Sequence, residues 1–440
     1  MKRAATIALF LLCSLVPMVA HAAGRAERRP DTRLEIFSWW TAGGEAEGLA
    51  AMFDRYRSLY PSVQIINATV AGGAGSNAKA VLATRMQGHN PPDSFQVHAG
   101  HELIDSWVRA GKMEPITFIF KDNGWLDRFP RGLIDIISYR GEIYSVPVNI
   151  HRSNVLWYNT RILASAHIRP PQTLDELDSV CEILSRRGIT PLALGDSGIW
   201  ATVHLLESVL LGSMGPERYK GLWTGDTPWD GPEVQLALIR LAGLMRYVNS
   251  DHAALSWDAA VQYVIDGKCA MTIMGDWAEG YFKAKGFTPG RDFGWTPSPG
   301  TRGSFIMLSD SFGLPMGAPD RDAAVHWLTL AASREGQDAF NPKKGSIPSR
   351  IDGNRSLYDE YQRSAMDSFG RDTIVPSVTH GAAASEGWLA MIQDTMSIFV
   401  CDLNIDKATA GLVAAAQKYV HEPVETFSGT LPAPDTLPKR

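Results

Sequence analysis

Two adjacent tryptophans, Trp39 and Trp40, directly follow the short run LEIFS at residues 34–38. An indole ring offers a flat surface for the apolar face of a pyranose ring, whose hydroxyl groups also need polar partners around the rim. The alternative for a tryptophan pair is packing in the core. Because successive side chains of a strand point to opposite sides, one of the two can pack inside while the other faces a ligand. The pair therefore indicates an aromatic binding surface.

Three short motifs could instead indicate an enzyme or a metal site. The sequence GDSG at residues 195–198 matches the nucleophile turn of trypsin-like proteases, but those enzymes need an earlier His and Asp in a strand-rich chain. The sequence GAG at residues 73–75 lacks the spacing and the acidic residue of a dinucleotide-binding loop, and indicates a tight turn. His98 and His101, with Glu102, lack the i,i+4 spacing of a helical zinc site. We therefore expect neither catalysis nor a metal or other cofactor.

Strands and helices alternate in the region that holds the tryptophan pair. Apolar residues recur at helical spacing between residues 45 and 60, ending at Pro61, whereas the flanking runs have the length of strands. We expect strands at residues 34–38, 63–70 and 94–97, and helices at residues 45–60, 77–86 and 101–110. This alternation is typical of an α/β fold with a mostly parallel sheet flanked by helices. Such sheets bind ligands at the carboxyl ends of their strands.

The chain of 440 residues is too long for one hydrophobic core, since domains usually contain about 100–200 residues. An extended segment at residues 143–158 predicts a crossing to a second lobe near Asn149. We expect a return near Asp310 and a last crossing at residues 377–381. The first lobe is then residues 34–149 plus 311–375, and the second is residues 150–310 plus 376–440.

The N-terminal residues have the pattern of an export signal. An apolar run at residues 4–20, after a basic start and before the small-residue pattern AHA, predicts a signal peptide over residues 1–22. Residues 23–33 form a charged tether. Cys13 lacks the small preceding residues of a lipoprotein signal, and no later run reaches the about 18 apolar residues of a membrane span. We therefore expect a free periplasmic protein.

Composition narrows the class of partner. The formal net charge is −5, with 45% hydrophobic and 20% charged residues, which is ordinary for a globular protein and argues against a nucleic-acid partner. Cys181, Cys269 and Cys401 remain after cleavage of the signal peptide. They allow one disulfide with one buried thiol, or three buried thiols.

Several motifs agree in order along the chain: FSWWTAGGE, FQVH, VPVNIHRSNVLWYN, MGDWAEGYF, LSDSFGLP, FNPKKGSIPSR and VTHG. Together they resemble the extracellular (periplasmic) solute-binding proteins of bacterial ABC sugar importers, specifically the glucose- or mannose-binding branch. The resemblance spans roughly residues 34–416. It implies a two-lobe periplasmic binding protein fold, in which lobes joined by crossing segments close over one monosaccharide. It also implies a monomer that docks on membrane permease subunits.

Carried over by position, the resemblance implies that Trp40 stacks on the sugar ring and Trp39 forms a wall or part of the core. Polar partners for the sugar would come from Glu45, Gln96, His98, Asp310, Lys344 and His380. The candidates in the second lobe are Trp257, Asp276 and Trp277. Replacing Trp40 by alanine is expected to weaken sugar binding while leaving the fold intact.

Two other functions stay open on the sequence alone. A secreted glycoside hydrolase also combines tryptophans with carboxylates, and would need two carboxyl groups about 5–10 Å apart. The same receptor fold could instead bind an oligosaccharide or a polyol. An oligosaccharide would need a longer aromatic floor than a single pyranose ring.

Overall fold

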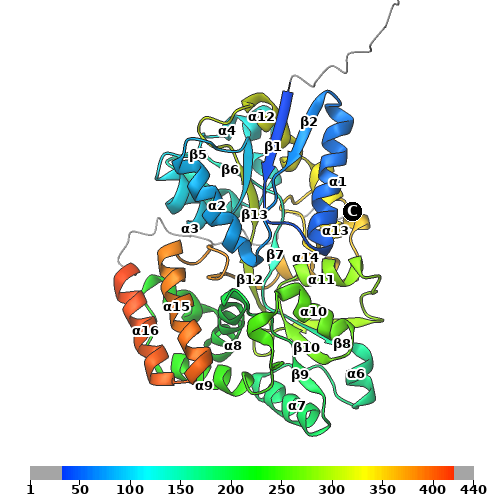
Figure 1. Cartoon of the computed structure of the whole chain (residues 1–440), viewed down its shortest axis with the longest axis vertical. Coiled ribbons are helices and arrows are strands. Elements are labelled where there is room, and N and C mark those ends of the chain that lie inside the picture. The colour runs from blue at the N-terminus through cyan, green and yellow to red at the C-terminus, as the bar shows by residue number, and fades with distance from the viewer. Residues whose placement is uncertain (1–31, 421–440) are drawn as a thin grey trace, which may run out of the picture.

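The computed structural model describes residues 32–420. Two lobes lie one above the other along the long axis of the molecule, with short strands between them (Figure 1). Among the described residues, none of the helices is both long and apolar enough to cross a membrane. The signal peptide and nearly all of the tether expected from the sequence lie outside the described residues.

The first lobe is built on a five-stranded sheet in the order β2-β1-β3-β13-β6. Its strands are β1 (Thr32–Phe37), β2 (Val63–Asn67), β3 (Ser94–His98), β6 (Ser145–Pro147) and β13 (Asp310–Gly313). Strand β1 runs parallel to β2 and β3, whereas β13 runs antiparallel to β3 and β6. Strand β13 is antiparallel because it enters the sheet at the carboxyl end of β3, where Asp310 pairs with His98.

Helices cover this sheet, and the two expected at residues 45–60 and 77–86 lie close to their predicted positions. They are α1 (Gly43–Leu59), α2 (Ser76–Gln87), α4 (Thr117–Asp122), α5 (Arg131–Ile136), α12 (Arg321–Ala332) and α13 (Arg334–Lys344). The helix expected at residues 101–110 is instead a short α3 (His101–Leu103) followed by a π-helical turn at Ile104–Val108. In that turn the amide of Arg109 donates to the carbonyl of Ile104, which widens the helix by one residue.

The second lobe is built on a four-stranded sheet in the order β11-β8-β10-β9. Its strands are β8 (Val155–Asn159), β9 (Thr190–Leu192), β10 (Cys269–Ile273) and β11 (Phe293–Pro297). Only β9 and β10 pair in parallel, and β8 runs antiparallel to both β10 and β11. The α/β fold expected from the sequence is confirmed, but its sheets mix parallel and antiparallel pairs.

The second lobe contains several helices, one of which is bent. They are α6 (Thr160–Ser165), α7 (Leu174–Arg186), α8 (Trp200–Thr224), α9 (Pro232–Leu244), α10 (Trp257–Ile265), α11 (Trp277–Ala284), α15 (Glu386–Asp402) and α16 (Ile405–Tyr419). Helix α8 changes direction at Gly215, which has a positive φ of 78° and is followed by Pro216. Helices α15 and α16 pack beside α8 and α9 in the lower left of Figure 1.

A small three-stranded sheet, β14-β12-β7, connects the lobes. It consists of β7 (His151–Arg152), β12 (Ser304–Leu308) and β14 (Thr373–Pro376). Two of the three positions where crossings were expected are hydrogen-bonded to each other. Asn149 Nδ2 donates to Asp310 Oδ2 at 2.8 Å, and the Asp310 amide donates to Asn149 Oδ1 at 2.8 Å. Helix α14 (Glu360–Phe369) lies at this junction, where its Tyr361 packs on Trp157 of β8.

The three cysteines in the described part of the chain are free. The alternative of three buried thiols holds for Cys181 and Cys269, which are buried. It fails for Cys401, which is exposed on α15. Burial raises the pKa of the Cys181 and Cys269 thiols to about 12, so both stay protonated and unreactive near neutral pH.

Candidate functional site

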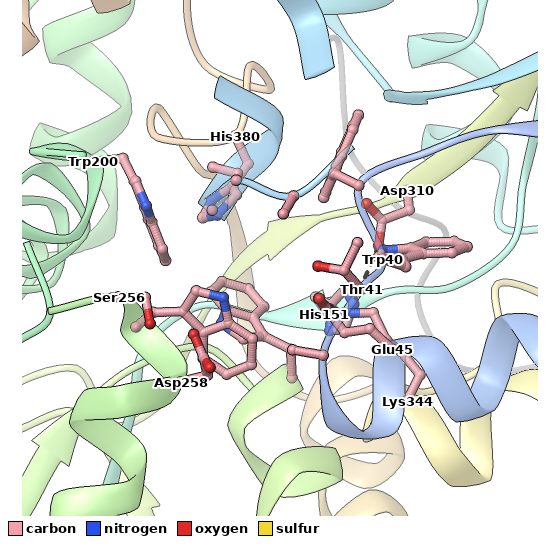
Figure 2. Close-up of a pocket in the computed structure, with 18 of the residues that line it drawn as sticks. Trp40, Thr41, Glu45, His151, Trp200, Ser256, Asp258, Asp310, Lys344 and His380 are labelled. Atoms are coloured by element: carbon pink, nitrogen blue, oxygen red, sulfur yellow. Dashed lines mark hydrogen bonds and ion pairs between the residues drawn. The ribbon is translucent and has the colours of Figure 1, made fainter. Parts of the chain in front are cut away.

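A cavity of about 310 Å³ lies between the two lobes. Five tryptophans line it: Trp39 and Trp40 from the loop after β1, Trp200 at the start of α8, Trp257 at the start of α10 and Trp277 at the start of α11. Each of these side chains is at most 7% exposed. The cavity is thus lined by aromatic side chains from both lobes, and Figure 2 shows its labelled side chains.

Both members of the tryptophan pair line the cavity. Strand β1 ends at Phe37, so the side-to-side alternation that was expected to separate the pair no longer applies at these positions. Trp40 is 1% exposed and packs on Phe340 at 4.6 Å and on Phe312 at 5.5 Å between ring centroids. Its indole Nε1 has no hydrogen-bond partner among the described residues.

The ring of Trp39 lies against a glycine of the next loop. A Cβ atom on Gly75, where φ is +75°, would lie 2.8 Å from the Trp39 indole, and one on Gly73 would lie 2.4 Å from the indole Nε1 of Trp200. The GAG sequence at residues 73–75 forms a 3₁₀ turn, as its reading as a tight turn predicted. Its glycines let the backbone approach two of the cavity tryptophans.

A buried ion pair lies at one side of the cavity. Glu45 is in the first turn of α1 and Lys344 is the last residue of α13, and their Oε1 and Nζ atoms are 2.8 Å apart. Burial raises the pKa of Glu45, against the opposing charge of Lys344. The Lys344 ammonium also lies 5.9 Å from the ring of Trp40 and 5.8 Å from that of Trp277, within the range of a cation–π contact.

Asp310, at the start of β13, is the second buried carboxylate of the cavity wall. Its oxygens accept hydrogen bonds from Gln96 Nε2 at 2.9 Å and from Asn149 Nδ2 at 2.8 Å. Burial alone would raise the pKa of Asp310, but the hydrogen bond from His151 and the charges of Lys344 and His151 hold it below its ordinary value. Asp310 therefore stays ionised and can accept hydrogen bonds.

Gln96 and Asp276 lie behind the wall rather than on it, because neither side chain lines the cavity. Gln96 accepts from the backbone amide of Trp39 at 3.1 Å and donates to Asp310. Asp276 is hydrogen-bonded to His151 Nδ1 and accepts from the Arg152 amide at 3.0 Å. The other nine residues predicted for the site all line the cavity: Trp39, Trp40, Glu45, His98, Trp257, Trp277, Asp310, Lys344 and His380.

The two histidines of the predicted site are each held by a polar neighbour. His98 Nδ1 lies 2.6 Å from Glu102 Oε2, which also bonds the Lys79 ammonium at 2.6 Å. His380 Nδ1 lies 2.9 Å from the hydroxyl of Ser377. Their rings meet edge to face with centroids 5.4 Å apart.

Sequence reasoning missed part of the lining. The missed residues are Thr41, Ala42, Ala71, Gly72, Gly73, Ala74, His151, Ser197, Trp200, Ser256, Asp258 and Leu308. Trp200, Ser256 and Asp258 lie across the cavity from Asp310 and Lys344 (Figure 2). Most of these residues belong to loops or to the first turn of a helix. The predicted starts of helices were therefore the signal in the sequence that could have located them.

The groups that line the cavity suit reversible binding of a small ligand. Indole faces, carboxylates, an ammonium, imidazoles and hydroxyls surround one small space, and these are the groups expected where a ligand with apolar faces and a polar rim is bound. The buried carboxylates Glu45 and Asp310 are engaged with Lys344 and with the amide donors of Gln96 and Asn149.

Comparison with known proteins identifies the family. The family model of bacterial extracellular solute-binding proteins matches residues 42–338. An uncharacterized ABC transporter extracellular-binding protein of Pyrococcus horikoshii is 38% identical over 389 residues, covering 88% of this chain and 87% of that protein. A probable sugar-binding periplasmic protein of Brucella suis is 30% identical over 413 residues, covering 92% and 96%.

Among solved structures, a chitin oligosaccharide binding protein superimposes with a TM-score of 0.77 at 19% identity, covering 88% of this chain and 99% of that one. This likeness shows a shared fold. Proteins of the matched family bind solutes and are not enzymes, in agreement with the prediction of a non-enzymatic receptor. This chain belongs to the bacterial extracellular solute-binding proteins.

Proposed function

We propose that this protein captures a monosaccharide of the glucose or mannose type in the periplasm and delivers it to the permease of an ABC importer. The observation that carries the proposal is the size and lining of the cavity between the lobes. Its volume of about 310 Å³ lies at the lower end of the about 300–1,000 Å³ of small-molecule pockets. Five indoles around so small a space suit one pyranose ring.

In this proposal the lining residues divide the work of recognition. The indoles of Trp40 and Trp277 cover the apolar faces of the sugar, Asp310 and Glu45 accept hydroxyl protons, and Lys344 donates. Trp39, His98, Trp257 and His380 complete the wall. Gln96 and Asp276 act from behind the wall. Gln96 holds Trp39 and Asp310 in place, and Asp276 holds the ring of His151.

In this proposal the lobes separate to admit the sugar, because residues of both lobes line the cavity. Hinge motion at the three crossing segments would widen the cavity. The sugar then favours the closed form only through contacts that are better made there. Glu45 and Lys344 from the first lobe and Trp277 from the second are such contacts.

The Brucella suis relative is named as a probable sugar-binding protein, which supports a sugar as the ligand. The structurally similar chitin oligosaccharide binding protein makes a longer sugar the second candidate. The side of the cavity with Ser256 and Asp258 would be the place for a further sugar unit, since Ser256 is exposed at the start of α10. Cavity size favours the monosaccharide.

Isothermal titration calorimetry tests the proposal with glucose, mannose, galactose, maltose and sorbitol. We expect binding of glucose or mannose and at least tenfold weaker binding of maltose and sorbitol. Asp310→Asn should weaken the binding strongly, because it replaces an ionised acceptor. Glu217→Gln, whose side chain is 79% exposed on α8, is the matched control. Tight binding of maltose with no response to a monosaccharide would favour the oligosaccharide receptor instead.

A further inference from the structure

A buried carboxylate behind the cavity wall holds the crossing segments together. Glu207 of α8 is fully buried and accepts hydrogen bonds from the amides of Val378 at 3.0 Å and Thr379 at 3.3 Å. Its oxygens also accept from the hydroxyl of Ser377 at 2.9 Å and from that of Ser153. Four donors from two crossing segments therefore converge on one side chain.

Each of these serines also touches a histidine. Ser377 Oγ lies 2.9 Å from His380 Nδ1, and Ser153 Oγ lies 3.1 Å from His204 Nδ1. A hydroxyl has a single proton to donate. When Glu207 is ionised, each serine donates that proton to it and can then only accept from its histidine. Both imidazoles must then carry their proton on Nδ1, which leaves Nε2 as an acceptor.

The two arms of this arrangement end differently. His380 lines the cavity, so its Nε2 is the ring atom left for a ligand. His204 does not line the cavity, and its Nε2 has no hydrogen-bond partner among the described residues. Burial lowers the pKa of His204 to about 3 and holds that of His380 well below its ordinary value. Both rings are therefore neutral at pH 7, the state in which the tautomer decides between donor and acceptor.

We infer that Glu207 is a positioning residue that acts through Ser377 to fix His380 as a hydrogen-bond acceptor at the cavity wall. This inference rests on the proposed function, since it assigns one specificity contact to the sugar. A ligand hydroxyl that meets His380 must donate its proton there. An acceptor group at that place, such as a methoxy or a fluoro substituent, is disfavoured.

Glu207 and the two histidines, His204 and His380, could also be read as a metal site. Ligand atoms of His204, Glu207 and His380 lie within 4.8 Å of one another, and two histidines with a carboxylate are a common set for transition metals. However, the four donors already occupy the oxygens of Glu207. A metal would have to displace the hydrogen bonds that hold the crossing segments.

Nitrogen-15 NMR of the histidine side chains tests the inference without any sugar. Burial raises the pKa of Glu207 to about 7, so spectra are recorded at pH 8.5, where this carboxylate is ionised. Signals are assigned with His380→Asn and His204→Asn. We expect the Nδ1–H form at both rings in the unmodified protein. Ser377→Ala should remove that preference at His380 alone, and the matched variant Ser153→Ala should remove it at His204 alone.

A second measurement connects the tautomer to binding. Calorimetry should show about tenfold weaker binding of the preferred monosaccharide to Ser377→Ala, with no change in Ser397→Ala on the exposed face of α15. The deoxy sugar that lacks the donating hydroxyl should bind both proteins equally. If no sugar binds the unmodified protein, the proposed function fails while the NMR result still stands.

Three outcomes would overturn the inference. The first is an Nε2–H signal at His380 in the unmodified protein. The second is an unchanged His380 signal in Ser377→Ala. The third is saturable binding of Zn²⁺ with shifts at both histidines, which would assign the cluster to a metal.

Discussion

Trp40 belongs both to the cavity wall and to the hydrophobic core. Its ring is almost fully buried between Phe312 and Phe340. Replacing it by alanine removes a large core side chain, which typically costs about 3–5 kcal/mol of unfolding free energy. We therefore expect Trp40→Ala to lower stability in urea unfolding as well as to weaken sugar binding. The expectation of an intact fold, drawn from sequence alone, ignored this core contact.

Trp39→Ala is the matched control for that experiment. Trp39 is also in the cavity wall, but it packs on Gly75 and His98 rather than on core phenylalanines. The Trp39→Ala variant should lose less unfolding free energy than Trp40→Ala, at a comparable loss of sugar affinity. Equal losses of stability in the two variants would contradict the distinct core role of Trp40.

Glu102 gives a prediction for the dependence of stability on pH. Burial alone would raise its pKa, but the charges of His98 and Lys79 lower it from 4.5 to about 2. Because the folded-state value is the lower one, the ionised carboxylate stabilises the fold above about pH 4.5. That stabilisation is lost as the pH falls from 4.5 towards 2.

The size of this contribution is about 3 kcal/mol by linkage. Urea unfolding at pH 7 and at pH 2.5 should show a smaller loss of unfolding free energy in Glu102→Gln than in the unmodified protein. Other carboxyl groups titrate in both proteins and cancel in the comparison. Parallel losses in the two proteins would show that Glu102 is not held ionised by its neighbours.

At the scale of elements, three helices from the two lobes meet at glycines. A Cβ atom on Gly280 of α11 would lie 2.4 Å from the carbonyl oxygen of Lys344, and one on Gly44 of α1 would lie 2.8 Å from the Cα of Gly280. No side chain can be added there without moving α11 away from α1 and α13. This close approach is what places Trp277, at the start of α11, beside Lys344.

Gly280→Ala should therefore weaken sugar binding by about tenfold or more, equal to about 1.4 kcal/mol, as measured by calorimetry. Alanine otherwise favours a helix over glycine by about 1 kcal/mol. Gly243→Ala in α9 is the matched control, because a Cβ atom there meets nothing within 4 Å. It should raise stability slightly and leave affinity unchanged. An unchanged affinity in Gly280→Ala would show that this contact does not limit closure.

Sequence patterns located the elements well where apolar spacing was regular. Helix α1 was expected at residues 45–60 and is found at Gly43–Leu59, and α2 was expected at residues 77–86 and is found at Ser76–Gln87. The site was predicted less completely. Trp200 and His151 line the cavity because segments far apart in the sequence meet across the junction, and no local pattern encodes such a meeting. Strand direction was mispredicted for the same reason, since β8 pairs with β10 and β11 through tertiary contacts.

At the scale of the whole molecule, one ion-pair chain connects the cavity to the outer contact between the lobes. From the cavity wall, His98 bonds Glu102, and Glu102 bonds the Lys79 ammonium of α2. Lys79 lies 3.5 Å from Glu386 of α15 in the other lobe. Glu386 also accepts a hydrogen bond from Ser106 at 3.0 Å. Glu386 is therefore the second lobe's end of a polar contact that holds the lobes together.

Glu386→Gln should favour separation of the lobes and so weaken sugar binding. The expected loss is about 0.2–1 kcal/mol, because Lys79 and Glu386 are 23% and 40% exposed and partly exposed pairs contribute little. Calorimetry at 20 mM and 500 mM NaCl checks the cause. Salt screens this pair, so the difference in affinity between the variant and the unmodified protein should shrink at high salt. A difference that is the same at both salt concentrations would show that the Lys79–Glu386 charge pair does not stabilise the closed form.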